Sequence, residues 1–140
     1  MKTKSMAMLC VSMLIALCFS ACNTPNEPNE IGNAPTLIVG LWNLDKAASY
    51  EEFSGNRMDY NEKKIDSKTL NFKSDGTVER VEVSNGSSVP VTMSYSISGN
   101  SLNLGGINWT ILKINQNNLV IETSKEIMGH ATVNHEVYTR

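Results

Sequence analysis

Three features of the sequence predict an all-β domain, an eight-stranded antiparallel up-and-down barrel. Apolar side chains recur at every second position in short segments, most clearly at residues 89–98. Dipeptides such as Asp75-Gly76 and Asn85-Gly86, which tolerate the positive φ of tight hairpin turns, separate these segments. No helical period follows residue 36. Consecutive hairpins leave two exposed sheet edges, which closure into a barrel hides, and a two-sheet sandwich is the alternative.

The expected strands follow one another with short turns between most of them. They cover residues 39–46, 70–73, 77–84, 89–98, 101–104, 107–114, 119–123 and 132–140. Within 107–114 the apolar residues change parity, since Trp109 and Ile111 alternate with each other but not with Leu112 and Ile114. Either a β-bulge interrupts this strand or both of its faces are covered.

Residues 47–67 do not follow the alternating pattern. The segment is long, charged and irregular, although it also contains apolar and aromatic side chains. Connections of this length in a compact domain are usually functional or disordered. We therefore expect a lid or omega-type loop across one end of the barrel, and the alternative is that its aromatic side chains plug that end as core.

The start of the chain indicates export. Lys2 and Lys4 precede an uncharged apolar run over residues 6–19, which is typical of a signal peptide. The run is too short for a membrane-spanning helix, which needs roughly 18 or more apolar residues. The alternative is a short N-terminal helix of the folded domain.

The run ends in Phe-Ser-Ala-Cys at residues 19–22, which resembles the lipobox of bacterial lipoproteins. The resemblance implies that Cys22 is linked to a diacylglycerol and becomes the new N-terminus, acylated with chains such as palmitate. It also implies a signal peptide over residues 1–21, a lipidated tether rich in proline and asparagine over 22–36, and a domain over 37–140. Phe19 departs from the usual aliphatic residue. A plain secretion signal is the alternative, but it requires a small residue at that position.

Cysteine usage and charge exclude several functions for the exported part. No cysteine follows Cys22, so the domain has no disulfide, no thiol nucleophile and no thiolate metal ligand. Beyond the signal peptide, ten lysines and arginines stand against fourteen aspartates and glutamates, a net charge of −4. Nucleic-acid binding is disfavoured, because it depends on clustered positive charge.

Short motifs in order along the chain give a family resemblance. They are Gly40-Leu41-Trp42, then Phe-Lys-Ser-Asp-Gly-Thr at 72–77, Asn-Leu-Val-Ile-Glu at 118–122, and a terminal Arg140. In these motifs the chain resembles the lipocalin-like domains of bacterial envelope lipoproteins. The resemblance implies that Trp42 closes one end of the barrel and that Arg140 lies across its ring, a cation–π contact of roughly 0.5–2 kcal/mol. The second and third lipocalin signatures are not found, so no ligand residues are carried over.

An eight-stranded barrel is wide enough for a packed core or for one small ligand. If a cavity exists, we expect about 300 Å³ or more, open at the end formed by residues 50–60. The candidate cavity residues are Met93, Tyr95, His135, Tyr50, Phe53 and Tyr60. Parity places the following side chains inward: Trp42, Leu44, Leu70, Phe72, Val81, Val83, Val91, Met93, Tyr95, Ile97, Leu102, Leu104, Trp109, Ile111, Leu119, Ile121, Val133 and Val137. His135, which shares the parity of the last two, is interpreted as an interior histidine or as a polar group of the cavity.

The leading hypothesis is a membrane-anchored binding module for a small apolar or amphipathic ligand, without catalysis. The alternative is an interaction or inhibitor lipoprotein that binds an envelope protein through its loops, and an enzyme would need a polar cluster that shifts pKa values in the cavity. No cofactor is expected. No metal is expected either, because His130 and His135 would point to opposite faces of one strand. The expected location is the cell envelope, at the periplasmic or surface face of the outer membrane.

Overall fold

The computed structural model describes residues 28–54 and 56–140. A 3-10 turn η1 (Ile31–Asn33) and a short helix α1 (Ala34–Leu37) precede the strands. The described residues form nine strands: β1 (Gly40–Phe53), β2 (Asn56–Glu62), β3 (Ser67–Phe72), β4 (Thr77–Ser84), β5 (Ser87–Ser98), β6 (Ser101–Leu104), β7 (Ile107–Ile114), β8 (Asn118–Ile127) and β9 (His130–Thr139). In this described part of the chain, no helix is long and apolar enough to cross a membrane.

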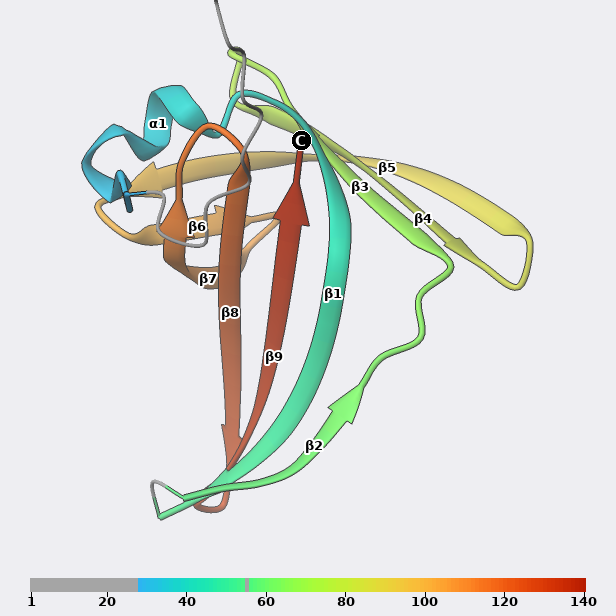
Figure 1. The fold of residues 1–140 in the computed structure, drawn as a ribbon, viewed down its shortest axis with the longest axis vertical. Helices are drawn as coiled ribbons and strands as arrows, with labels where there is room; N and C mark the ends of the chain where they lie inside the picture. Colours follow the sequence, from blue (N-terminus) through green and yellow to red (C-terminus); the bar gives the residue numbers. More distant parts are fainter. Residues whose placement is uncertain (1–27, 55) are drawn as a thin grey trace, which may run out of the picture.

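Eight of the strands close into a barrel (Figure 1). The strands β1 and β3 to β9 pair antiparallel in chain order, and β9 then returns to pair with β1, from Asn43↔Thr139 to Phe53↔His130. Closure leaves no free edge in the eight-strand ring. The predicted eight-stranded antiparallel up-and-down barrel is therefore confirmed, and the two-sheet sandwich is excluded.

The ninth strand corrects the prediction for residues 47–67. This segment is not a lid or omega-type loop, because it contains the second half of β1 and all of β2, which pair with each other from Ala48↔Glu62 to Phe53↔Asn56. The alternation of apolar and polar residues did not reveal the rest of this strand, because a β-bulge shifts the register of β1 against β9 between Leu44 and Lys46. The parity of the inward side chains changes there, and the strand continues beyond it.

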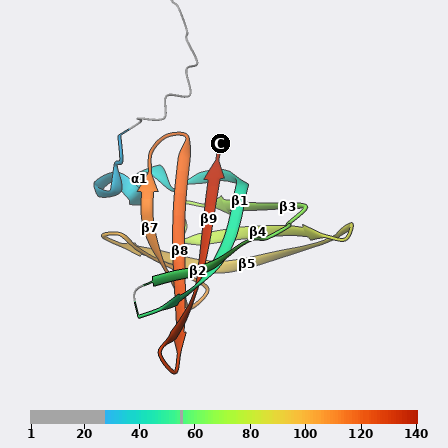
Figure 2. The same ribbon diagram turned by 60° about the horizontal axis from the view of Figure 1, so that its bottom comes forward.

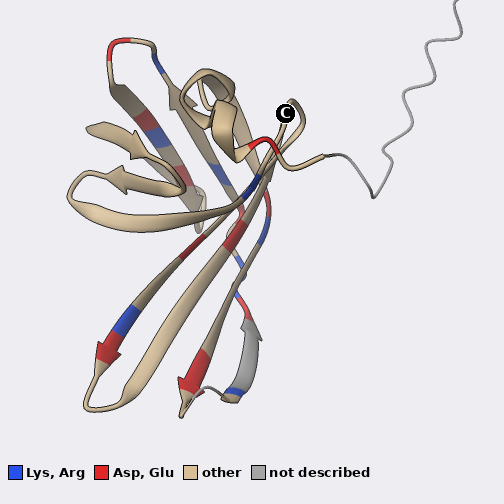
Figure 3. Cartoon of the chain, turned by 90° about the vertical axis from the view of Figure 1, so that its left-hand side faces the viewer, with Lys and Arg blue, Asp and Glu red and all other residues tan. Residues whose placement is uncertain are grey.

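Two hairpins project from the closed barrel (Figure 2). One is β4–β5. The other is formed by β8 and β9, which continue beside the second half of β1 and β2; we call this region, residues 48–62 and 122–135, the arm. Figure 3 shows acidic and basic residues interspersed along the strands.

The N-terminal turn and helix cover one end of the barrel. Ala34 and Ile38 are fully buried there, and the Trp42 indole donates a 2.7 Å hydrogen bond to the Ile38 carbonyl. The Glu30 amide donates to the Ile114 carbonyl at 2.8 Å. Residues 28–36, predicted as part of a tether, are therefore docked on the barrel, because Ala34 and Ile38 fill the space beside Trp42. The remainder of the predicted tether and the signal peptide lie outside the described residues.

The parity change predicted in β7 is a bulge. The register between β7 and β8 shifts between Ile111 and Lys113, so that Leu112 is 41% exposed while Ile111 and Ile114 are buried. The buried hydrophobic cluster consists of Ala34, Ile38, Trp42, Leu70, Phe72, Val78, Leu102, Leu104, Ile111, Ile114, Leu119, Ile121 and Tyr138.

Candidate ligand site

A cavity of about 320 Å³ lies inside the barrel and has one apolar wall. It is bounded by inward-facing side chains of β3, β4, β5, β6, β7 and β9. The apolar wall is formed by Leu70, Val91, Met93, Leu104, Ile107 and Trp109, and the polar lining by Lys68, Arg80, Glu136 and Tyr138. Ile107 is 57% exposed, so the cavity meets solvent at the start of β7.

The register of β3 and β4 explains why charged side chains face inward. Leu70 and Phe72 are buried in the core, and they lie directly opposite Arg80 and Val78. Opposite residues of an antiparallel pair share a face, so Arg80 points into the barrel. By the same alternation Glu82, opposite Lys68, also lies on the inner face.

This register corrects the prediction that Val81 and Val83 face inward. Both are half-buried on the outer face, where they pair with Thr69 and Ser67. The pairing of β4 shows no bulge, so the inward parity of Val78 continues to the end of the strand. The charged residues at positions 80 and 82 take the places that were assigned to the valines.

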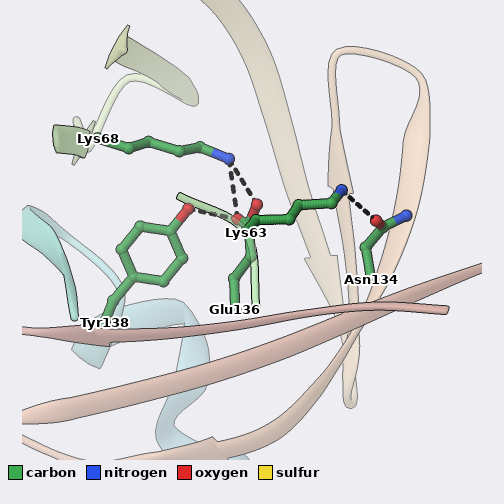
Figure 4. Close-up of polar contacts among 5 residues, drawn as sticks. All are labelled: Lys63, Lys68, Asn134, Glu136 and Tyr138. Atoms are coloured by element: carbon green, nitrogen blue, oxygen red, sulfur yellow. Dashed lines mark hydrogen bonds and ion pairs between the residues drawn. The ribbon is translucent and has the colours of Figure 1, made fainter. Parts of the chain in front are cut away.

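A buried ion pair forms the polar end of the cavity (Figure 4). The Lys68 ammonium donates to both carboxylate oxygens of Glu136, at 2.8 and 2.9 Å, and each residue is 8% exposed. The Tyr138 hydroxyl donates to Glu136 Oε2 at 2.5 Å. Burial, together with the negative charge of Glu136, raises the pKa of Tyr138 well above its ordinary value. Lys68, Glu136 and Tyr138 thus satisfy one another.

Arg80, which is half-buried, differs from this network because one of its donors is buried and not satisfied. Its Nε atom is buried and has no hydrogen-bond partner. Among residues 28–54 and 56–140, no side chain forms a hydrogen bond or ion pair with its guanidinium. A cavity with an apolar wall and an unpartnered guanidinium can hold an amphipathic molecule that supplies a hydrogen-bond acceptor.

A second hollow of about 470 Å³ lies between the start of β1 and residues 62–69. Exposed charged side chains such as Lys46, Lys63, Lys64 and Asp66 line much of it. We take the smaller cavity as the candidate ligand site because its lining combines an apolar wall with buried polar groups.

The predicted cavity residues are placed in different parts of the molecule. Met93 lines the cavity, while Tyr95 packs edge-to-face on Phe72 with ring centroids 4.9 Å apart and donates to the Lys73 carbonyl at 2.9 Å. Phe53 is 45% exposed in the arm, 4.7 Å from the His130 ring. The side chain of Tyr60 lies outside the described part of the structure.

Tyr50 and His135 lie in the arm, around Glu122, on the sheet face opposite to Glu136. Glu122 Oε2 accepts a 2.8 Å hydrogen bond from the Tyr50 hydroxyl and lies 3.3 Å from His135 Nδ1 and 3.7 Å from Arg57 Nη2. The Arg57 guanidinium lies 4.0 Å from the centroid of the Tyr50 ring. Burial and the hydrogen bond to Glu122 raise the pKa of Tyr50 to about 12.

His135 is therefore not an interior residue. It shares the parity of Val133 and Val137 as predicted, but Glu136 and Tyr138 occupy the inward positions of β9. Across the described residues, no group of three or more histidine, cysteine, aspartate or glutamate side chains could hold a metal ion. Cys22 lies outside the described residues.

The closed end of the barrel is held by Arg140. Its guanidinium lies 4.1 Å from the centroid of the Trp42 ring, and it donates to the carbonyls of Leu37 and Val39, the latter at 2.9 Å. Gly40 lies beneath it with φ +124°, a backbone conformation that side-chain-bearing residues rarely adopt. The C-terminal residue thereby joins α1 to the barrel.

A closed eight-stranded antiparallel barrel with an internal cavity and a tryptophan–arginine contact at one end defines a class of small closed β-barrel domains. The model of the lipocalin-like domain family matches residues 38–121. The chain therefore belongs to the lipocalin-like domain family, as its motifs predicted. Lipocalin folds typically bind small hydrophobic ligands rather than catalyse reactions.

Comparison with curated protein sequences gave no match. Among solved structures, the chain is similar to lobster apocrustacyanin A1, with 9% identity, a TM-score of 0.47, and coverage of 81% of this chain and 69% of that one. It is also similar to the siderocalin Ex-FABP, with 12% identity, a TM-score of 0.44, and coverage of 74% and 70%. A protein of unknown function from Nostoc punctiforme matches with 14% identity, a TM-score of 0.30, and coverage of 75% and 48%.

Proposed function

We propose that this protein is a membrane-anchored binding module that holds one small amphipathic molecule inside its barrel and performs no catalysis. The observation that carries the proposal is the cavity of about 320 Å³, which joins an apolar wall to a polar end. Pockets that bind small molecules have this size and this mixture of many apolar and few polar groups.

The anchor in this proposal is the acylated Cys22. The sequence at residues 19–22 supports it. A lipid at this position would hold the domain at the cell envelope, at the periplasmic or surface face of the outer membrane. One acyl-bearing end group with several chains gives stable anchoring, which a single short chain does not.

Binding and anchoring are tested on protein purified from membranes of its own cells. Val91→Phe places a ring in the cavity, whereas Thr92→Phe places the same ring on the exposed outer face of the neighbouring position. With decanol as probe and tryptophan fluorescence as readout, we expect Val91→Phe to weaken binding about tenfold, because the ring fills space that the alkyl chain would occupy, and Thr92→Phe to leave it unchanged. Intact mass should include a lipid on the wild type and lose it in Cys22→Ala.

A wild type that binds neither decanol nor a longer apolar alcohol would contradict the binding proposal. Equal affinity of the two phenylalanine variants would show that the probe binds elsewhere. An unmodified mass for the membrane-extracted wild type would contradict the lipid anchor alone.

A second candidate function is binding of an envelope protein through the arm. Phe53, Ile127 and Met128 are 45%, 59% and 96% exposed near its tip, which is an unusual concentration of exposed apolar side chains. The test places a crosslinker at residue 128. Capture of one specific envelope protein, to the same extent in wild type and in Val91→Phe, would favour this function over ligand binding.

A further inference from the structure

We infer that the ligand of the cavity carries a single carboxylate, which the guanidinium of Arg80 binds while an apolar tail lies along the wall. This inference rests on the proposed ligand binding and names the chemical class of the ligand.

Arg80 is placed for this role by two neighbouring strands. It lies opposite Leu70 on one side and opposite Val91 on the other, so that its side chain enters the cavity from the middle of β4. Its Nε is buried without a partner. An arginine remains protonated inside proteins, and an unsatisfied donor of a buried charged group is costly. An acceptor on a ligand would remove that cost.

The protein's own acceptors in the cavity do not satisfy Arg80. Glu136 already accepts two hydrogen bonds from Lys68 and one from Tyr138. Glu82 also lies on the inner face, two residues along the strand from Arg80, but among the described residues it forms no ion pair with Arg80 or Lys68. The unmet requirement of the cavity is therefore an acceptor for the Arg80 fork.

The charges around Arg80 limit the negative charge that a ligand can carry. Lys68 and Glu136 neutralise each other, and Glu82 already adds a negative charge on the same inner face, so Arg80 is the lining cation without a protein partner and has little counter-charge to spare for a dianion. A carboxylate carries one charge and fits the planar guanidinium with two parallel hydrogen bonds. A phosphate monoester carries nearly two charges at neutral pH, and a second cation would be needed to balance it.

The apolar wall indicates where the alkyl tail of the ligand would lie. Val91 lies directly opposite Arg80, and Met93 and Trp109 continue the wall away from it. A medium-length alkyl chain attached to the carboxylate would contact these side chains and reach solvent near Ile107. Methionine adapts its shape readily, which suits a flexible chain.

The test compares decanoate with decanol, which has the same tail without the charge, on full-length protein at neutral pH. We expect wild type to bind decanoate more tightly than decanol. Arg80→Met keeps an unbranched stem but removes the guanidinium, and it should weaken decanoate binding by about tenfold or more while decanol affinity is kept, because a hydrogen bond to a charged group is lost. Lys125→Met removes an exposed positive charge in the arm and should change neither affinity.

Several results would overturn the inference. If wild type binds decanol as tightly as decanoate, or if Arg80→Met reduces both affinities equally, the carboxylate assignment fails while the proposed binding function stands. Tighter binding of decyl phosphate than of decanoate would overturn the single-charge assignment. If neither decanoate nor decanol binds to the wild type, the proposed function fails and the inference fails with it. Circular dichroism of each variant confirms that its barrel is folded.

Discussion

Lys68 and Glu136 place opposite charges inside a barrel whose core is otherwise mainly apolar. Each is 8% exposed, and each depends on the other because a buried charge is poorly compensated without a partner. A buried pair of this kind adds little net stability over apolar residues, yet loss of one partner leaves an uncompensated charge. The pair therefore acts as a fixed polar end for the cavity rather than as a main source of stability.

We predict that Lys68→Met destabilises the protein by about 3–5 kcal/mol, because Glu136 is left charged and without its ion-pair partner in the interior. The free energy of unfolding is measured by urea denaturation. The double variant Lys68→Met/Glu136→Gln removes both charges and retains an acceptor for the Tyr138 hydroxyl, so we expect it to recover most of the loss. If the double variant is no more stable than Lys68→Met, the two side chains are not coupled as the structure indicates.

These interior charges show what the sequence could not predict. In the segment 77–84, alternation is clear, but it does not say which face is the inner one. Two valines at 81 and 83 outnumber the single Val78, so the burial of apolar side chains favoured the wrong face. The correct face is set by pairing with Leu70 and Phe72, which involves another strand. Arg80 was missed as a site residue for this reason, whereas Met93 in the apolar wall was predicted.

At the scale of elements, bulges decided which strands could be recognised. The change of parity in β7 predicted either a bulge or a strand covered on both faces, because apolar residues stand on both sides of it, and the structure shows the bulge. The bulge in β1 lies beside polar residues, and the strand beyond it is partly exposed on the arm, so its apolar pattern does not continue. The first strand was therefore predicted to end near residue 46, and β2 was not predicted.

The cap formed by η1 and α1 was also not predicted, because four helical residues carry no periodic signal. Ala34 and Ile38 are buried only because Trp42 and Arg140 form the surface on which they pack. The sequence did predict the contact of Arg140 with Trp42 through its family resemblance. The function of that contact in the structure is to hold the cap as well as to close the barrel.

We predict at this scale that Arg140→Ala lowers the free energy of unfolding by about 1–3 kcal/mol, since a cation–π contact and charged hydrogen bonds to two carbonyls are lost. Arg140→Lys keeps the charge without the planar fork and should fall between. Hydrogen exchange of residues 31–38 is expected to increase more than that of β8. Equal exchange in wild type and Arg140→Ala would show that the cap does not depend on this residue.

For the whole molecule, chain-order pairing and closure followed from the regular spacing of turns, and these were predicted correctly. From β3 to β9, each strand pairs with the next strand in sequence. Local turn chemistry is therefore sufficient to specify most of the topology. The β1–β9 pairing joins the two ends of the domain. Because β1 and β9 stay paired as they run from the barrel into the arm, the arm belongs to the same continuous sheet.

The shared pairing connects Tyr50 in the arm to the stability of the whole fold. The pKa of Tyr50 is raised from 10.0 to about 12, first by burial and then by its hydrogen bond to Glu122. The folded protein therefore holds this proton at pH values where the unfolded chain has released it. The stabilisation that Tyr50 contributes is fully present below pH 10, declines above it, and is lost as the pH rises through about 12.

Tyr50→Phe removes this titration and should flatten the loss of stability with pH by up to about 1.4 kcal/mol per pH unit between the two pKa values, the slope expected for one proton. Tyr138, whose pKa is also raised, titrates in the same direction in both proteins, so it cancels in the difference. Urea denaturation of wild type and variant across this range measures the two slopes. Identical slopes would mean that the Tyr50 hydroxyl ionises in the folded arm as readily as in the unfolded chain, contrary to its burial against Glu122.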